Sequence, residues 1–351
     1  MKGKIKRCLA GALATLICFG ASFFVACIND TQTSSISNST TSSTIEGNSS
    51  SESSSSSESS SSSTDQDSST DNDSSSYPQI DVFDKDSYTD TWDDPTLRSV
   101  KFRVCSYNIA HGLDYSTDPA AVRIHKTGVF LKQYGVDIAG LNEVYDKSSN
   151  TDYLNQAGRV ALYAGLEYHV WGQGKQFDWG GNVALGNAVI SKYKFLDTQF
   201  IAVPAPVVGD SDYRSEYSNL YEDRVIVKTT MNVGREICFI TTHFGLVGEE
   251  QNRMIAELTK VLDAETRPVI LCGDFNAEPD ATQLKPIYER LQSAADLMDK
   301  RYEPTISSWD PHATIDYIFV SDHFIVKDYG VVDVLMSDHM PIWADLEIVV
   351  H

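Results

Sequence analysis

The chain has 351 residues, with 28 Lys and Arg against 49 Asp and Glu, which gives a formal net charge of −21. Residues 78–351 carry most of the excess, with 24 basic and 41 acidic side chains. This acidic body excludes a protein that coats DNA or RNA by broad neutralisation of phosphates, but it leaves room for a local cationic or metal-filled pocket.

Residues 1–27 have the pattern of a secretory signal. Basic residues stand at positions 2, 4, 6 and 7, and an almost uninterrupted apolar run extends from there to Ala26. Phe24-Val25-Ala26-Cys27 is similar to a bacterial lipobox, with Phe24 where leucine is usual. We therefore expect lipidation at Cys27; the alternatives are a plain signal peptide or a single anchoring helix, since the run is about long enough to span a bilayer. In each case the body lies outside the cytoplasm, and lipidation would hold it at the bacterial cell membrane.

Residues 28–78 form a linker rich in serine and threonine. The segment has scattered acidic residues and almost no apolar ones, so burial cannot offset the entropy lost on folding. We expect a disordered tether with an r.m.s. span of roughly 40 Å. A glycosylated stalk is the alternative. The remaining residues, 79–351, are expected to form the folded domain.

Within this domain, predicted strands and helices alternate from about residue 98 onward. Runs of β-branched and aromatic residues predict strands, and apolar residues at helical spacing predict helices. The predicted strands are 100–108, 136–141, 167–172, 184–191, 224–231, 236–242, 268–271, 315–321, 324–334 and 342–350. The predicted helices are 119–134, 156–164 and 249–262.

Three cysteines follow Cys27, each in an apolar run typical of a strand: Cys105, Cys238 and Cys272. Their number is odd and their spacing fits no zinc pattern. We expect buried free thiols, with a disulfide or a metal role as the alternative.

Polar side chains capable of acid–base or metal chemistry stand at the ends of several predicted strands. They are Asn108, Glu143, His243, Asp274 with Asn276, Asp316, and Asp338 with His339. A single residue of this kind is usually a turn or helix cap. Six strand ends with such chemistry instead indicate a functional site on a rigid scaffold.

These residues lie in segments that occur in a characteristic order. The segments are Ser106-Tyr107-Asn108-Ile109, Leu141-Asn142-Glu143-Val144, Gly186-Asn187-Ala188, Thr242-His243-Phe244, Gly273-Asp274-Phe275-Asn276, Ile315-Asp316-Tyr317 and Ser337-Asp338-His339-Met340-Pro341. The set resembles the endonuclease/exonuclease/phosphatase superfamily over residues 100–350. The resemblance implies an α/β fold, a four-layered αββα sandwich of the DNase I type, and hydrolysis of phosphate esters.

Phosphate esters resist attack because the phosphoryl group is already negative, so a site needs a divalent cation, an activated water and stabilisation of the added charge. The resemblance assigns the metal to Glu143, with Asn108 and Asp338 beside it, and Mg²⁺ or Mn²⁺ is the expected cofactor. Such hard cations prefer oxygen ligands. Asn108 would also contact the substrate phosphate, although a strand-end turn cap is its alternative role.

The same resemblance assigns the catalytic groups. Asp274 would orient or deprotonate the attacking water, and Asn276 would donate to a phosphate oxygen. Their alternate spacing predicts that both side chains lie on one face of an extended segment. His339 would contact the scissile phosphate, and Asp316 would hold its imidazole in one tautomer. His243 would protonate the leaving oxygen or stabilise the pentavalent centre.

Other residues have two open interpretations. Arg224 resembles a phosphate-contacting arginine, or it forms an ion pair with a neighbouring acid. His111 follows Asn108 closely and is a candidate for the pocket lining, whereas Asn187 is expected to be a structural hydrogen-bonding residue. The sequence departs from the family where His312-Ala313-Thr314 replace a frequent basic residue, and where Ala256 stands in a position often held by glutamine.

Three functions are consistent with this sequence. The preferred one is a secreted, Mg²⁺-dependent phosphoesterase, expected to be a monomer whose partners are a phosphate-ester substrate and the membrane. The second is narrower, an extracellular nuclease or a phospholipid phosphodiesterase. The third is a non-enzymatic surface lipoprotein that uses the fold for binding. Trp171, Phe177 and Trp179 would form either an aromatic rim for a lipid or base, or the edge of a packed core.

Overall fold

The computed structural model describes residues 98–112, 120–146, 148–151, 154–177, 183–206 and 221–350. All of them fall within residues 72–351, one of two units into which the chain divides. The predicted signal segment, the lipidation site and the serine-rich linker lie outside the described residues. In the part of the chain that is described, no helix combines the length and the apolar character needed to cross a membrane.

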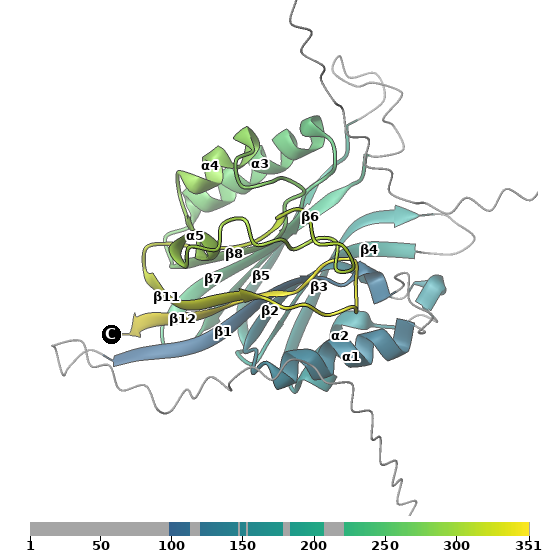
Figure 1. Cartoon of the computed structure of the whole chain (residues 1–351), viewed down its shortest axis with the longest axis horizontal. Coiled ribbons are helices and arrows are strands. Elements are labelled where there is room, and N and C mark those ends of the chain that lie inside the picture. The colour runs from purple at the N-terminus through teal and green to yellow at the C-terminus, as the bar shows by residue number, and fades with distance from the viewer. Residues whose placement is uncertain are drawn as a thin grey trace, which may run out of the picture. The chain divides into compact units, whose positions relative to one another are not determined.

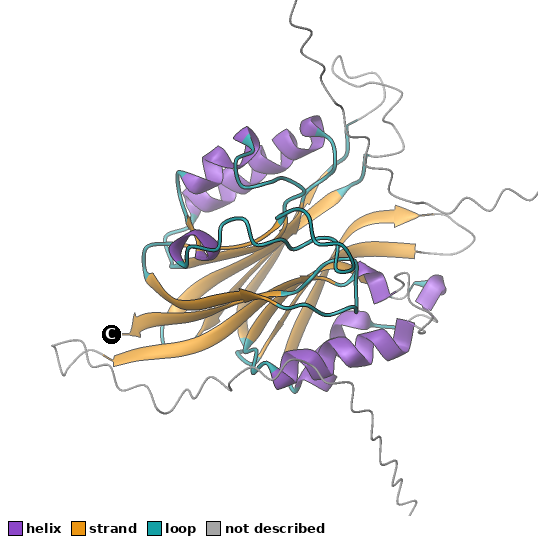
Figure 2. Cartoon of the chain, viewed as in Figure 1, coloured by secondary structure: helices purple, strands orange, loops and turns teal. Residues whose placement is uncertain are grey.

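Two mixed β-sheets form the centre of the structure (Figures 1 and 2). In the described residues, the first sheet has the strand order β11-β12-β1-β2-β4-β3, and the second has the order β5-β6-β7-β8-β10-β9. The first sheet comprises β1 (Arg98–Asn108), β2 (Ile138–Tyr145), β3 (Tyr168–Phe177), β4 (Val183–Ser191), β11 (Phe324–Val331) and β12 (Ile342–Val350). The second comprises β5 (Phe195–Val203), β6 (Arg224–Asn232), β7 (Glu236–His243), β8 (Val269–Asp274), β9 (Gln292–Ser293) and β10 (Asp316–Val320).

Helices cover the outer faces of both sheets. Figure 1 shows α1 (Ala120–Gln133) and α2 (Gln156–Ala164) against the first sheet, and α3 (Gly248–Ala264) and α4 (Lys285–Tyr288) against the second. The short α5 (Ala294–Leu297) contacts β9, β10 and β11. Short 3₁₀ turns are η1 (Ala110–Gly112), η2 (Ser149–Thr151) and η4 (Thr282–Leu284).

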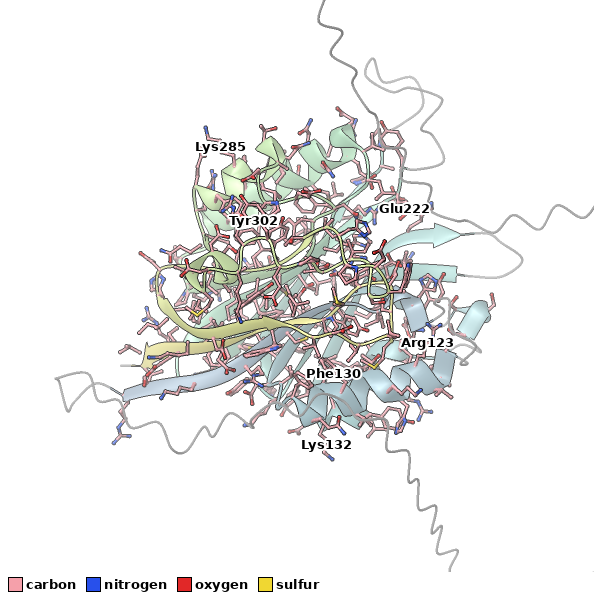
Figure 3. All side chains as sticks on the ribbon, viewed as in Figure 1. Arg123, Phe130, Lys132, Glu222, Lys285 and Tyr302 are labelled. Atoms are coloured by element: carbon pink, nitrogen blue, oxygen red, sulfur yellow. The ribbon has the colours of Figure 1, made fainter. Side chains whose placement is uncertain are left out.

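The alternation of side chains along the strands builds three apolar cores. In β1, Phe102 and Val104 point into the core between the sheets, whereas Cys105 and Tyr107 point towards α1 and α2. A third core lies between the second sheet and α3 and α4. Phe130 on α1 is buried in the second of these cores, while Lys132 on the same helix points away from it (Figure 3). Alternate strand residues thus serve two different layers, and the predicted four-layered αββα sandwich is confirmed.

Some predicted elements differ from the observed ones. The strand β5 was not expected, because it lies at the edge of its sheet and exposes much of its length, so its sequence lacks a clean apolar alternation. The strand β2 continues past Leu141 to Tyr145, through a register shift against β4. Cys105, Cys238 and Cys272 are buried and free, as predicted.

A buried ion cluster at the end of α3 provides a test of the fold. The Glu265 side chain is 2 % exposed, and its carboxylate lies 2.8 Å from Lys228 Nζ and 2.7 Å from Arg267 Nε. Although burial by itself raises the pKa of Glu265, the hydrogen bonds from Arg267 and Lys228 lower it below its ordinary value.

Replacement of Glu265 by glutamine is expected to lower the free energy of unfolding at pH 7 by about 2 kcal/mol, because it leaves two cations without their partner. A carboxylate whose pKa is depressed by folding stabilises the native state above its unfolded pKa, here near 4.5, and this contribution is lost as the pH falls through the folded pKa. The difference between the two proteins should therefore shrink below about pH 4.5. Urea denaturation across this range would measure it. Glu257→Gln, which removes an exposed pair with Lys260, is the control, and an equal loss in both variants would contradict the argument.

Candidate active site

The strand directions bring the predicted polar residues to one edge of the two sheets. β1 runs parallel to β2, and β7 runs parallel to β8, so four strands end at this edge. β10 is antiparallel to β8 and β12 is antiparallel to β1, so these two strands begin there. In the registers, Asn108 is opposite Asn142, and Asp274 is opposite both His243 and Asp316.

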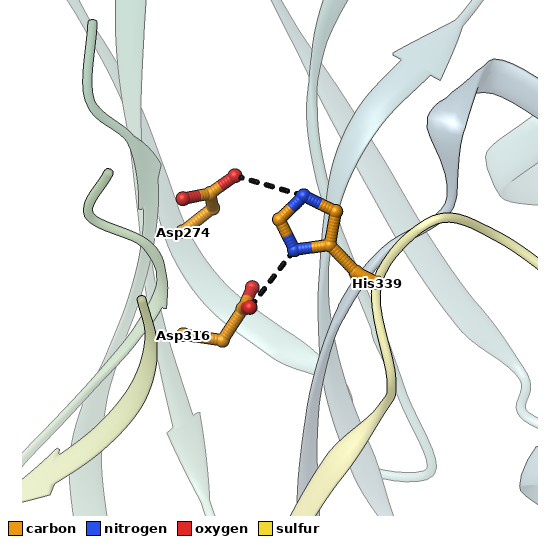
Figure 4. Close-up of side chains that lie close together, drawn as sticks. All are labelled: Asp274, Asp316 and His339. Atoms are coloured by element: carbon orange, nitrogen blue, oxygen red, sulfur yellow. Dashed lines mark hydrogen bonds and ion pairs between the residues drawn. The ribbon is translucent and has the colours of Figure 1, made fainter. Parts of the chain in front are cut away.

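His339 lies between two carboxylates (Figure 4). Its Nδ1 is 2.8 Å from Asp316 Oδ2, and its Nε2 is 3.5 Å from Asp274 Oδ2. Thr305 Oγ1 donates to the same Asp316 oxygen at 2.7 Å. Burial by itself lowers the pKa of His339, but the negative charges of Asp316 and Asp274 outweigh it and raise that pKa to about 10. The imidazole is therefore protonated at neutral pH.

Asp274 is the buried acid at the centre of the site. Its Oδ2 accepts a hydrogen bond of 3.0 Å from Asn108 Nδ2, and its backbone N–H donates to Asn142 Oδ1 at 3.1 Å. Burial, together with the charge of Asp316, raises the pKa of Asp274 to about 7, against the opposing effect of His339. A carboxylate with such a pKa can accept a proton near neutrality.

Asn276 reaches the site by a turn, so the prediction of an extended segment is wrong. Its φ is 47°, in the left-handed region, and its backbone N–H donates to Asp274 Oδ1 at 2.9 Å. This is an Asx turn, in which the Asp274 side chain accepts from the backbone N–H two residues later. The Asn276 amide still faces the site, since Nδ2 is 2.9 Å from Phe244 O and 3.2 Å from His243 Nε2.

His243 is a neutral imidazole in this setting. Its Nε2 lies 3.4 Å from Asp274 Oδ2. Burial and the positive charge of Arg224 lower the pKa of His243 to about 3, despite the opposing effect of Glu143. A neutral ring can accept the Asn276 amide hydrogen, but its one remaining N–H is too weakly acidic to protonate a leaving oxygen at neutral pH. Of the two imidazoles, His339 is the one whose pKa favours the doubly protonated, positively charged form at neutral pH.

Glu143 sits inside β2 at the point where the register with β4 shifts, with a φ of 52°. Such a bulge re-aims a side chain that would otherwise alternate along the strand. Asn108 Nδ2 is 3.0 Å from Glu143 Oε1, so this one amide group bridges Glu143 and Asp274. Burial raises the pKa of Glu143, but hydrogen bonds from His111 and Asn108 and the nearby imidazoles lower it overall, and the carboxylate is ionised.

The residues predicted to hold a metal fit a hard cation. Asp338 is near enough to Glu143 that burial and this second negative charge raise its pKa. The two carboxylates supply oxygen donors, and their mutual repulsion is what a divalent cation would relieve. The Asn108 amide presents Nδ2 to Glu143, while its Oδ1 accepts from the Ala110 N–H. A second group, Asp274, Asp316 and His339, also has ligand atoms within 4.8 Å of one another. In that group, however, His339 Nδ1 is engaged by Asp316.

Arg224 is paired with acids, which was the alternative to phosphate contact. Its Nε lies 2.7 Å from Glu250 Oε1, and its Nη2 lies 3.3 Å from Glu222 Oε2. The pair is buried rather than on the surface. Arg224 and His243 line the same small pocket, and the charge of the guanidinium acts on His243 and Glu143.

The predicted aromatic rim is not borne out at Trp171. Its indole Nε1 donates to Val144 O at 2.9 Å, and the ring packs on the core beneath α1 and α2, so Trp171 belongs to a core edge. The Phe177 side chain and Trp179 lie outside the described part of the structure.

Asn142 is a site residue that the sequence analysis missed. Its Nδ2 is 2.9 Å from both Asn187 Oδ1 and Thr242 O, and its Oδ1 accepts from the Asp274 N–H. The Asn187 amide in turn donates to Val225 O at 2.8 Å, which confirms its predicted hydrogen-bonding role. These two buried amides tie the first sheet to the second beside Asp274. The available signal was a lone amide before Glu143 in an apolar strand.

Comparison with known proteins identifies the family of this chain. A family model described as "Endonuclease/Exonuclease/phosphatase family" matches residues 105–339. Nocturnin from Xenopus laevis is 27% identical over 142 residues, which are 33% of this chain and 36% of that protein. The chain thus matches about a third of the length of this curated relative.

Solved structures show the same fold. The endonuclease/exonuclease/phosphatase from Bacteroides vulgatus has a TM-score of 0.55 and 20% identity, with 71% of this chain and 99% of that chain covered. The mannosyl-6-phosphatase Bt3783 from Bacteroides thetaiotaomicron has a TM-score of 0.52 and 17% identity, with 70% and 99% covered. Since the family model spans well over half of the sequence, this chain belongs to the endonuclease/exonuclease/phosphatase family, whose members are hydrolases of the phosphoesterase and nuclease type.

Proposed function

We propose that this protein is a secreted phosphoesterase that depends on a divalent metal and cleaves its substrate by attack of water. The observation that carries the proposal is the placement of His339 between the carboxylates of Asp316 and Asp274, beside Glu143, which the Asn108 amide joins to Asp274. The family supports the same class of reaction, since its enzymes are typically dependent on a divalent metal.

Asp274 is the base in this proposal. Its pKa of about 7 lets a substantial fraction of the carboxylate take a proton from water at neutral pH. The hydrogen bonds from Asn108 Nδ2 and from the Asn276 N–H hold its two oxygens, so the carboxylate keeps one orientation. A fixed base next to bound phosphate is the geometry that in-line attack requires.

His339 supplies positive charge to the phosphoryl oxygens. The Asp316 carboxylate holds Nδ1, so Nε2–H points towards Asp274 and the place where a substrate phosphate would lie. Charge that is already positioned stabilises the transition state without reorganisation. Because Asp316 is itself held by Thr305, the imidazolium has a fixed direction.

Glu143, Asp338 and Asn108 would hold the metal, and Mg²⁺ or Mn²⁺ is the ion that we propose. When bound, such an ion polarises phosphoryl oxygens and offsets the negative charge of the reacting group. Neutral His243 and the amide of Asn276 form a hydrogen-bonding pair on the other side of Asp274. We assign this pair to hydrogen bonding with the phosphate oxygens, and not to proton transfer to the leaving group, with Arg224 contributing its field from the adjacent pocket.

The test is hydrolysis by the purified domain with and without EDTA. The panel contains bis-p-nitrophenyl phosphate, plasmid DNA, sphingomyelin, inositol phosphates and mannose 6-phosphate, with His339→Ala as the blank. We expect turnover of at least one substrate that EDTA abolishes and that added Mg²⁺ or Mn²⁺ restores. Equal rates with and without EDTA would rule out the metal mechanism, and no turnover by any preparation would favour the non-enzymatic lipoprotein.

The location of the protein is a separate part of the proposal. The basic and apolar N-terminal run that ends at Cys27 supports export and lipid anchoring to the cell membrane. Metabolic labelling with a palmitate analogue should tag the wild-type protein and not Cys27→Ala. A Cys27→Ala protein that still takes the label would disprove lipidation at this residue.

A further inference from the structure

His111 has a contact with the proposed metal site that its position in the sequence only hinted at. Its Nδ1 lies 3.3 Å from Glu143 Oε2, and Asn108 Nδ2 lies 3.0 Å from Oε1 of the same carboxylate. Each carboxylate oxygen therefore has one neighbouring nitrogen and, since it can accept two bonds, one direction left for a cation. The side chains of His111 and Glu143 are 28 % and 26 % exposed, so the pair opens to solvent.

The backbone around His111 is held in an uncommon conformation. Ala110, His111 and Gly112 have φ values of 44°, 43° and 68°, so three successive residues lie in the left-handed region. For residues other than glycine this conformation is costly, and it persists where surrounding contacts enforce it, often at functional sites. Here the Ala110 N–H donates to Asn108 Oδ1 at 3.1 Å, and the Gly112 N–H donates to Ile109 O at 2.9 Å.

The buried side-chain amide of Gln156 connects the turn that carries His111 to the strand that carries Glu143. Gln156 Nε2 donates to His111 O at 2.5 Å, and Gln156 Oε1 accepts from the Tyr145 N–H at 2.8 Å. The His111 ring also stacks on Tyr145, with 4.6 Å between ring centroids and an angle of 22° between the planes. Gln156 thus joins the turn that carries His111 to the end of β2, just past the bulge that carries Glu143.

We propose that His111 is a positioning residue of the metal site, whose Nδ1 pairs with Glu143 Oε2 across 3.3 Å and fixes the direction of this carboxylate. The inference rests on the proposed function, because it assumes that Glu143 binds the metal. Outer hydrogen-bond partners of metal ligands set ligand direction, and their loss typically weakens metal binding by about 10–100-fold.

Two substitutions separate the imidazole from the backbone that carries it. His111→Gly deletes the ring, and glycine accepts a φ of 43°, so weakened binding cannot come from backbone strain. His111→Asn keeps a donor, because Nδ2 of asparagine can occupy a place similar to Nδ1 of histidine, and asparagine tolerates the left-handed region. His323→Gly is the matched control, since His323 follows the far end of β10 and contacts Ser321 and Asp322.

The experiment measures Mn²⁺ affinity by titration calorimetry and thermal melting of each purified protein. We expect His111→Gly to weaken Mn²⁺ binding by about 10–100-fold, His111→Asn to recover most of the loss, and His323→Gly to bind as the wild type does. Wild-type affinity in His111→Gly would overturn the proposal. Equal loss in the glycine and asparagine variants would also overturn it, because donation to Glu143 would then not be the role.

Electron spin-echo measurements on bound Mn²⁺ provide a second readout. A directly coordinated imidazole gives a ¹⁴N coupling, so a coupling present in wild type and absent in His111→Gly would show direct ligation and overturn the positioning role. Its absence, together with the affinity loss, would support the proposal. A wild-type protein that binds no Mn²⁺ would instead overturn the metal site of the proposed function, which distinguishes the two failures.

Discussion

Replacement of His339 by glutamine is expected to lower kcat for phosphate-ester hydrolysis by about 10²–10⁴-fold, the range over which a positioned proton-bearing group acts. The physical reason is the fixed positive charge, because Asp316 and Asp274 raise the pKa of His339 to about 10 and keep its imidazole protonated. Glutamine can donate a hydrogen bond but carries no charge. Mn²⁺ affinity should change little, since the proposed ligands remain.

The measurement is kcat on the best substrate of the panel, with Mn²⁺ affinity and the melting temperature recorded in parallel. His323→Gln is the control, because it changes a histidine remote from the site in the same way. A variant that folds, binds Mn²⁺ normally and keeps wild-type kcat would remove His339 from the mechanism.

Replacement of Glu143 by glutamine is expected to weaken Mg²⁺ and Mn²⁺ binding by more than about 100-fold, the upper end of the effect of losing an outer hydrogen-bond partner. Among the proposed ligands, Glu143 is the carboxylate whose pKa is lowered, by hydrogen bonds from His111 and Asn108, so it is ionised and available to a cation. The isosteric amide keeps the volume and loses the charge that a hard cation needs. At a fixed metal concentration, turnover should fall with site occupancy and recover in part when more metal is added.

Calorimetric titration with Mn²⁺ measures the affinity, and turnover at rising Mg²⁺ concentration measures the recovery. Glu257→Gln, on the exposed face of α3, controls for the loss of one negative charge from an acidic protein. Unchanged Mn²⁺ affinity in Glu143→Gln would place the metal elsewhere, with the group Asp274, Asp316 and His339 as the next candidate.

Residue order alone was enough to find most of the site. Asn108, His243, Asp274 and Asp316 stand at the ends of strands whose apolar runs are plain in the sequence, and the structure brings them to one edge. The helix 156–164 was predicted with its observed bounds, and in the structure Asn155 caps its start and Gly165 ends it in the left-handed region. Such signals are local, and they do not depend on the partner that each element later packs against.

Other features depended on residues far away in the chain. Glu143 is aimed by a bulge that forms only when β2 pairs with β4, and Asn142 bonds to Thr242 and Asp274 on the opposite sheet. The strand β5 was missed for the same reason: it is an edge strand that forms by pairing with β6, and its own sequence has no clear strand pattern.

By itself, the sequence determined the acidic body from its composition and most strands and helices from local periodicity. The sandwich architecture and the set of acids, amides and imidazoles of the site came from the resemblance of its ordered motifs to the family. Only the tertiary structure separated the two imidazoles, because Asp316 and Asp274 raise the pKa of His339, whereas burial and the charge of Arg224 lower that of His243. It also decided that Asn276 approaches by a turn, and that His111 faces Glu143. Burial and charge act through space, so a group 30 or more residues away can change the pKa of another, as His111 lowers that of Glu143, which local patterning cannot do.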